Sequence, residues 1–127
     1  MKKKDIQILL VDDEPDILEI VGYNLSSEGY QVITADNGAK AVKLAQKHKP
    51  HLIILDVMMP EMDGLELLGK IKGDLKTQGI PVIGFTAGDV EYYRRKSLIP
   101  FDILVPKPMD FWDLHQLAKK KALTDLN

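Results

Sequence analysis

The chain has 127 residues, of which 45% are hydrophobic and 28% charged, and its formal net charge is -2. This length suits one domain, and the apolar content is too high for a disordered chain. The 17 basic residues are offset by 19 acidic ones, which gives no support for nucleic-acid binding. Cysteine is absent, which excludes disulfides and thiol catalysis and is compatible with a reducing cytosol. Because no apolar run approaches the ~20 residues that span a bilayer, we expect a single cytoplasmic domain over residues 1–127 that does not enter a membrane.

Short apolar runs alternate with stretches of helical spacing along the chain. The expected strands cover residues 6–11, 30–35, 52–56, 81–86 and 101–105, and the expected helices begin near Pro15, Gly38, Asp63 (as N-cap), Gly88 and Asp110. Strands that alternate with helices pair in parallel through right-handed crossovers. The pattern therefore predicts an α/β fold, with a doubly wound five-stranded parallel sheet and five helices. Gly84, inside an expected strand, predicts close approach of a neighbouring element.

Polar side chains stand at the ends of the expected strands. The first strand ends at Asp12 and Asp13, the third at Asp56, the fourth at Thr86 and the fifth at Lys107. The carboxyl ends of parallel strands meet at one edge, where α/β proteins bind their ligands. Three neighbouring carboxylates repel one another unless a cation lies among them, and oxygen ligands favour Mg2+. A carboxylate beside Mg2+ can attack a phosphoryl group, while a lysine and a hydroxyl contact its oxygens.

Each of these residues also has a simpler explanation when taken alone. Acids before Pro15 suit a helix N-terminus, and Asp56 followed by Pro60 and Gly64 suits a turn. Their joint position at strand ends favours a shared site. Packing or surface roles are expected for the remaining candidate ligands: Met58, Met59, Met62, His48, His51 and His115.

Four short motifs lie at these strand ends. They are D-D-E-P from Asp12, D-V-M-M-P-E-M-D-G from Asp56, T-A from Thr86 and K-P from Lys107. In this order and spacing the chain resembles the receiver domain of two-component response regulators, of the chemotaxis-regulator kind, over nearly its whole length. The resemblance implies a flavodoxin-like sheet in the order 2-1-3-4-5.

The resemblance also implies a phosphoacceptor signalling domain rather than an enzyme. Asp56 would accept a phosphoryl group from the phosphohistidine of a sensor histidine kinase or a histidine phosphotransfer domain. Asp12, Asp13, Asp56 and the backbone carbonyl of Met58 would bind Mg2+. The domain would thus assist its own phosphorylation.

The family's remaining features concern the fourth and fifth strands. Thr86 and Lys107 would contact the phosphoryl group, and the peptide between Lys107 and Pro108 would be cis. The signal would reach a downstream protein, or the chain's own output domain, through the face of the fourth helix, fifth strand and fifth helix. No direct nucleic-acid binding by this domain is expected.

Two parts of the chain depart from the family pattern. Leu104 stands where receivers usually carry an aromatic residue that couples to the threonine, and Ile99-Pro100-Phe101 replaces a usual Gly-Ala pair. We therefore expect an unusual relay beyond Thr86. In this family the residues two positions after the acceptor and two after the threonine tune how fast the phosphoryl group is lost. Here they are Met58 and Gly88, and neither can orient an attacking water by hydrogen bonding, which predicts slow autodephosphorylation.

Two other functions stay open on the sequence. A pseudo-receiver would keep the fold as a phosphorylation-independent interaction module. A phosphohydrolase of the dehalogenase type also uses a strand-end aspartate, but it normally carries a second acid where this chain has Met58. The sequence specifies neither the cognate kinase, the output pathway nor the oligomeric state, and it fits both a stand-alone receiver and part of a longer regulator or hybrid kinase.

Overall fold

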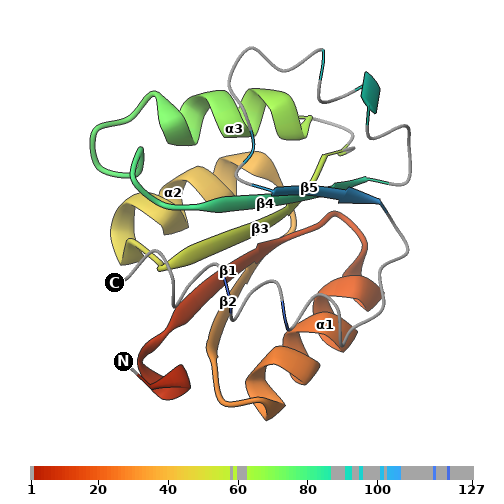
Figure 1. Ribbon diagram of the computed structural model, residues 1–127, viewed down its shortest axis with the longest axis vertical. Helices are drawn as coiled ribbons and strands as arrows, with labels where there is room; N and C mark the ends of the chain where they lie inside the picture. The colour runs from red at the N-terminus through yellow and green to blue at the C-terminus, as the bar shows by residue number, and fades with distance from the viewer. Residues whose placement is uncertain are drawn as a thin grey trace.

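A parallel sheet with the strand order β2-β1-β3-β4-β5 forms the centre of the molecule (Figure 1). The computed structural model describes residues 2–57, 59, 63–86, 91, 92, 95, 101, 103–106, 116 and 120. In chain order its elements are η1 (Lys3–Asp5), β1 (Gln7–Val11), α1 (Pro15–Ser27), β2 (Gln31–Ala35), α2 (Gly38–His48), β3 (Leu52–Asp56), α3 (Gly64–Lys72), β4 (Val82–Thr86) and β5 (Ile103–Pro106). The predicted α/β class with a parallel sheet is confirmed.

The helices expected after β4 and β5 lie mainly outside the described residues. Within those two stretches Glu91, Tyr92, Arg95, Gln116 and Lys120 are helical. The expected helix start at Asp110 and the cis peptide before Pro108 also fall outside the described residues. The count of five helices therefore stays a prediction.

Helices cover both faces of the sheet. Successive residues of each strand point to opposite sides, so each strand contributes side chains to both faces. One face packs against α2 and α3, and its buried residues include Leu9, Val11, Ile53, Leu55, Val82, Ala41, Ala45, Leu67, Leu68 and Ile71. The other face packs against α1, and its buried residues include Ile8, Leu10, Ile54, Ile83, Phe85 and Leu25. Figure 1 shows α1 on the opposite side of the sheet from α2 and α3. This double burial explains why β1, β3 and β4 are almost entirely apolar, whereas the edge strand β2 contains the exposed residues Gln31 and Thr34.

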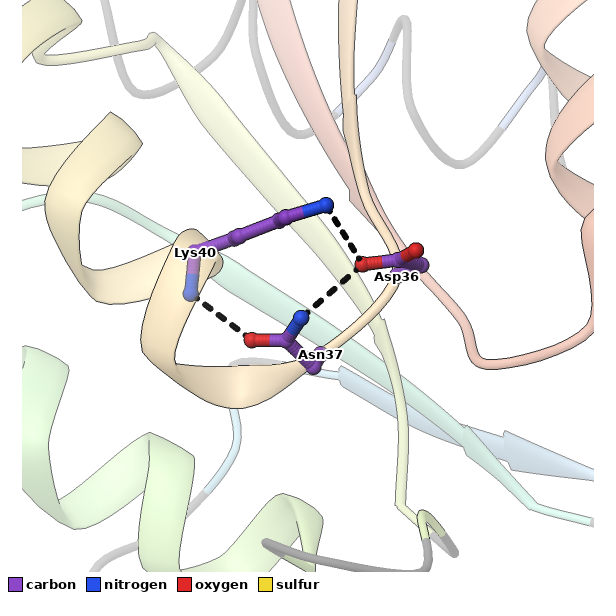
Figure 2. Close-up of polar contacts among 3 residues, drawn as sticks. All are labelled: Asp36, Asn37 and Lys40. Carbon is purple, nitrogen blue, oxygen red and sulfur yellow. Dashed lines mark hydrogen bonds and ion pairs between the residues drawn. The ribbon is translucent and has the colours of Figure 1, made fainter.

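The helices begin at residues whose chemistry suits a helix start. Pro15 occupies the first turn of α1, where its missing N–H costs nothing. The Asn37 side chain caps α2 by accepting a hydrogen bond from the Lys40 N–H at 2.9 Å (Figure 2). Asp63 caps α3 in the same way, with its Oδ1 accepting from the Glu66 N–H at 2.8 Å. The predicted cap at Asp63 is confirmed.

The strands β1, β2 and β4 each begin one residue later than expected, and two further differences are larger. A short 3-10 turn, η1, precedes β1 and was not predicted; the Ile6 N–H closes it by donating to the Lys3 carbonyl at 2.9 Å. The strand β5 covers Ile103–Pro106 instead of residues 101–105. Pro106 has no N–H to donate, and β5 tolerates it because this strand lies at the edge of the sheet.

Gly84 lies at a close contact between β4 and the chain that leads into β5. A Cβ atom at Gly84 would lie 2.6 Å from Cε1 of Phe101 and 3.1 Å from Cδ1 of Leu104. The predicted close approach at Gly84 is confirmed, and its cause is the aromatic ring of Phe101. Phe101 and Leu104, two residues that depart from the family pattern, therefore pack against the strand that ends at Thr86.

Candidate functional site

The carboxyl ends of β1, β3 and β4 meet because of the strand register. Val11 of β1 pairs with Leu55 of β3. The next residue of each strand is an aspartate, so Asp12 and Asp56 emerge side by side. Asp56 in turn pairs with Phe85, the residue before Thr86. The register thus brings three of the predicted site residues to one edge.

Asp12, Asp13 and Asp56 form one carboxylate cluster. One carboxylate oxygen from each lies within 4.8 Å of the others. Asp12 is fully buried and Asp56 is 3% exposed, whereas Asp13 is partly exposed. Three carboxylates at these distances repel one another, and burial removes the water that would screen them. The cluster therefore has a strong electrostatic reason to hold a cation.

Backbone hydrogen bonds hold Asp12 in place. Its N–H donates to the carbonyl of Ala35, at the end of β2, at 3.2 Å. Its side-chain Oδ1 accepts from the Glu14 N–H at 2.9 Å. A residue with a fixed backbone and a carboxylate that already accepts a hydrogen bond keeps its position without a cation, which lowers the entropic cost of binding one.

The chemistry of the cluster fits Mg2+. All three side chains offer hard oxygen ligands, which Mg2+ prefers, and Mg2+ commonly binds proteins through a small number of carboxylates while it keeps several waters. Among the residues that the structure describes, Asp12, Asp13 and Asp56 are the one group of three or more acidic or histidine side chains that lie close enough together to bind a metal ion. The predicted convergence of Asp12, Asp13 and Asp56 is therefore observed, while their ligand roles stay predictions.

Thr86 is the last residue of β4 and is fully buried. It pairs in register with Pro106, the last residue of β5. Lys107 follows Pro106 in the sequence, but it lies outside the described residues, as do Met58 and Gly88. The contacts predicted for Lys107 with the phosphoryl group and for the Met58 carbonyl with Mg2+ therefore stay predictions.

Gly64 supports the site and was not singled out for this role by the sequence. Its N–H donates to the carbonyl of Val57 at 2.6 Å. A Cβ atom at this position would overlap Cα of Val57 and lie 3.0 Å from the carbonyl oxygen of Asp56. Only glycine allows α3 to begin this close to the strand end that carries Asp56. The signal was a glycine at the first position of a helix, where a better helix former is normally preferred.

Several residues with possible ligand atoms have structural roles. Met59 is buried in the core beneath α2 and α3, which confirms its predicted packing role. The His51 Nδ1 accepts a hydrogen bond from the Gln7 N–H at 2.9 Å and so joins the starts of β3 and β1. His48 is exposed at the end of α2. His115 and Met62 lie outside the described residues.

Residues 8–119 match the response regulator receiver domain family. The chain belongs to this family. An uncharacterized 14.6 kDa protein of Leptolyngbya boryana is 36% identical over 119 residues, which cover 93% of this receiver and 91% of that protein. The alkaline phosphatase synthesis transcriptional regulatory protein PhoP of Bacillus subtilis is 44% identical over 92 residues, which are 72% of this chain. The matched region is only 36% of PhoP, so the receiver corresponds to a minor part of that regulator.

Solved structures share the fold of this receiver. The chemotaxis protein CheY4 of Vibrio cholerae superposes with a TM-score of 0.84 at 27% identity, over 91% of this chain and 98% of that one. The receiver domain of the sensor histidine kinase PA1611 of Pseudomonas aeruginosa superposes with a TM-score of 0.83 at 24% identity, over 92% and 97% of the two chains. The latter structure has a magnesium ion coordinated in its active site cleft. Among the described residues of this receiver, no helix is both long enough and apolar enough to cross a membrane.

Proposed function

We propose that Asp56 accepts a phosphoryl group from a phosphohistidine on a sensor histidine kinase or a histidine phosphotransfer domain, and that Mg2+ is the cofactor. The observation that carries the proposal is the convergence of Asp12, Asp13 and Asp56 within 4.8 Å at the carboxyl edge of the sheet. Membership of the receiver family and the magnesium ion in the PA1611 receiver support it. We further propose that residues 1–127 form a single receiver domain and that the protein is cytoplasmic, with which the absence of cysteine is compatible.

In this proposal each site residue has a separate role in phosphoryl transfer. A carboxylate oxygen of Asp56 attacks phosphorus, and the bond between phosphorus and the imidazole nitrogen breaks, with its electron pair returning to the imidazole. Asp12, Asp13 and Asp56, with the Met58 carbonyl, would hold the cation. When bound, Mg2+ neutralises charge on the phosphoryl oxygens. The Thr86 hydroxyl donates to one phosphoryl oxygen and the Lys107 ammonium pairs with another.

The response to phosphorylation begins at the end of β4 in this proposal. A phosphoryl group adds negative charge beside Thr86 and draws its hydroxyl inward, which shifts the chain after β4. The surface that changes is the face of the fourth helix, β5 and the fifth helix, which meets a downstream protein or an attached output domain. Because Met58 and Gly88 cannot orient an attacking water, we also propose that the phosphorylated form loses its phosphoryl group slowly.

The deciding experiment is incubation with acetyl phosphate and Mg2+ followed by intact mass spectrometry. We expect one added phosphoryl group, which is absent in Asp56→Asn and absent when EDTA removes the metal. Asp36→Asn is the matched control, because Asp36 is an exposed acid outside the cluster, and this variant should be modified like the natural chain. A folded protein that gains no phosphoryl group would instead favour a pseudo-receiver that acts as a phosphorylation-independent interaction module.

A further inference from the structure

Positive and negative charges are separated along this chain. Residues 5–39 contain eight acidic residues and no lysine or arginine, whereas residues 40–55 contain four lysines and no acidic residue. The first segment includes α1 and the second includes α2, and these helices cover opposite faces of the sheet (Figure 1). In the part of the chain that the structure describes, α1 thus carries acids and no basic residue, and α2 carries lysines and no acidic residue; we refer to the α1 face as the acidic side and to the α2–α3 face as the basic side.

The acidic side is centred on an exposed strip of α1. Ile20 is 58% exposed and Tyr23 is 72% exposed, and their three-residue spacing places them on one side of the helix. Asp16 and Glu19 are also exposed, each four residues before one of these apolar residues, so they share that side. We refer to Asp16, Glu19, Ile20 and Tyr23 as the α1 strip. It combines an apolar centre with negative charge.

The basic side contains a hollow between α2, α3 and the turn that follows α3. Its volume is about 740 Å³, and its lining includes Val42, Gln46, Lys70, Asp74, Leu75 and Lys76. Leu75 is 86% exposed, and Lys70 and Lys76 beside it are exposed as well. We refer to these lining residues as the α2–α3 hollow.

Neighbouring groups determine which charges this side offers to a partner. The Asp74 carboxylate accepts hydrogen bonds from Gln46 Nε2 at 2.6 Å and from the Lys76 N–H at 2.9 Å. At the start of α2, Lys40 is engaged by Asp36, with 3.2 Å between Nζ and Oδ1 (Figure 2). Lys43 and Lys47 are exposed further along the same helix. The charge around the hollow is therefore mainly positive.

We propose that the α1 strip of one molecule docks into the α2–α3 hollow of a second copy of this chain. Each face combines exposed apolar surface, from Ile20 and Tyr23 on the strip and from Leu75 at the hollow, with charged side chains, and the charges of the two faces are mainly opposite. Among the residues that the structure describes, four large apolar side chains are exposed, and the two faces account for three of them: Ile20, Tyr23 and Leu75. The partner with the matching chemistry is therefore the chain itself.

Other occupants fit the hollow less well. The carboxylate of Asp74 and the apolar side chain of Leu75 do not suit the closely spaced phosphates of a nucleic acid. Two α1 strips cannot pair with each other either, because their acids would meet. The contact is thus heterologous, with different surfaces on the two molecules. The two faces lie on opposite sides of the sheet, so a pair of molecules still has one open hollow and one open strip. Further copies can therefore bind, and association continues beyond a dimer.

The first test is sedimentation velocity of the full chain over a range of concentrations. At an ionic strength of ~20 mM we expect the weight-average mass to rise with concentration, and at ~500 mM we expect it to return to that of a monomer, because salt screens the marginal charges. Ile20→Lys and Leu75→Glu should each abolish association. Gln31→Lys, which adds the same charge at an exposed residue of β2 outside both faces, is the matched control and should associate normally.

Mixing the two defective variants separates this geometry from a symmetric dimer. The Ile20→Lys protein keeps its hollow and the Leu75→Glu protein keeps its strip. An equimolar mixture should therefore form a one-to-one pair that grows no further, although each variant alone stays monomeric. Circular dichroism checks that both variants are folded. The proposal is wrong if the natural chain is monomeric at every concentration, or if neither variant weakens association. It is also wrong if the mixture stays monomeric, or if a strictly monomeric chain binds an acidic peptide or duplex DNA.

Discussion

Asp12 lies beside Asp56 because β1 and β3 pair Val11 with Leu55, the residue before each aspartate. Their mutual repulsion is part of the energy of the folded chain when no cation is bound. We therefore expect Asp56→Asn to raise the free energy of unfolding in EDTA, by roughly 1–3 kcal/mol on the scale of two charges at this separation near a protein surface. Urea unfolding followed by circular dichroism measures this change.

With Mg2+ bound, the natural chain should become more stable than Asp56→Asn. A ligand that binds only the folded state stabilises it, by about 2.7 kcal/mol at a free concentration of ~100 times Kd. We expect the natural chain to gain stability on titration with Mg2+, and Asp13→Asn to gain much less. Asp36→Asn should respond like the natural chain. Equal gains in all three proteins would argue against cation binding at the carboxylate cluster.

Asn37→Ala tests the start of α2. The Asn37 side chain accepts a hydrogen bond from the Lys40 N–H and donates one from Nδ2 to Asp36 Oδ1 at 2.9 Å (Figure 2). Removal of such a cap typically lowers the free energy of unfolding by ~1 kcal/mol. Asn37→Ser can still accept from the backbone and should retain most of the stability. The prediction fails if the alanine and serine variants unfold at the same urea concentration.

Gly84→Ala tests the contact between β4 and Phe101. The new methyl group would lie 2.6 Å from the aromatic ring, so the ring or the strand must shift. We expect a loss of ~1–3 kcal/mol in the free energy of unfolding, the usual cost of overpacking. Phe101→Leu makes room, and the double variant should lose less than the sum of the two single changes. Purely additive losses would show that the two positions do not interact.

The pKa of Asp74 should lie below its ordinary value of 3.8. The Lys76 N–H and then the Gln46 side chain stabilise its charged form by hydrogen bonding. A lowered pKa in the folded state means that the stabilisation is complete above pH ~3.8 and is lost as the pH falls through the folded value. A carboxyl-detected NMR titration should place the midpoint below 3.8, and Gln46→Ala should raise it. A midpoint that Gln46→Ala leaves unchanged would exclude the side-chain contribution.

The regular patterns of the chain predicted most of the sheet and the convergence of its acids. Alternating apolar runs located the strands, and the parallel arrangement followed from the helices between them, which places Asp12 and Asp56 at one edge. The pattern could not reveal η1, because its residues are polar and its turn depends on a single backbone hydrogen bond from Ile6 to Lys3. Nor could it reveal what fills the space at Gly84, since Phe101 reaches that space only after the chain has folded back on β4.

The hydrogen bond from the Asp12 N–H to the Ala35 carbonyl has a consequence for long-range communication. Ala35 ends β2, and two residues later Asn37 caps α2, the helix that contributes Val42 and Gln46 to the hollow. The carboxylate cluster and the proposed self-association surface are thus connected through the Asp12–Ala35 hydrogen bond and α2. If Mg2+ changes the affinity of one copy for another, association must change the affinity for Mg2+ by the same factor, because such coupling is reciprocal.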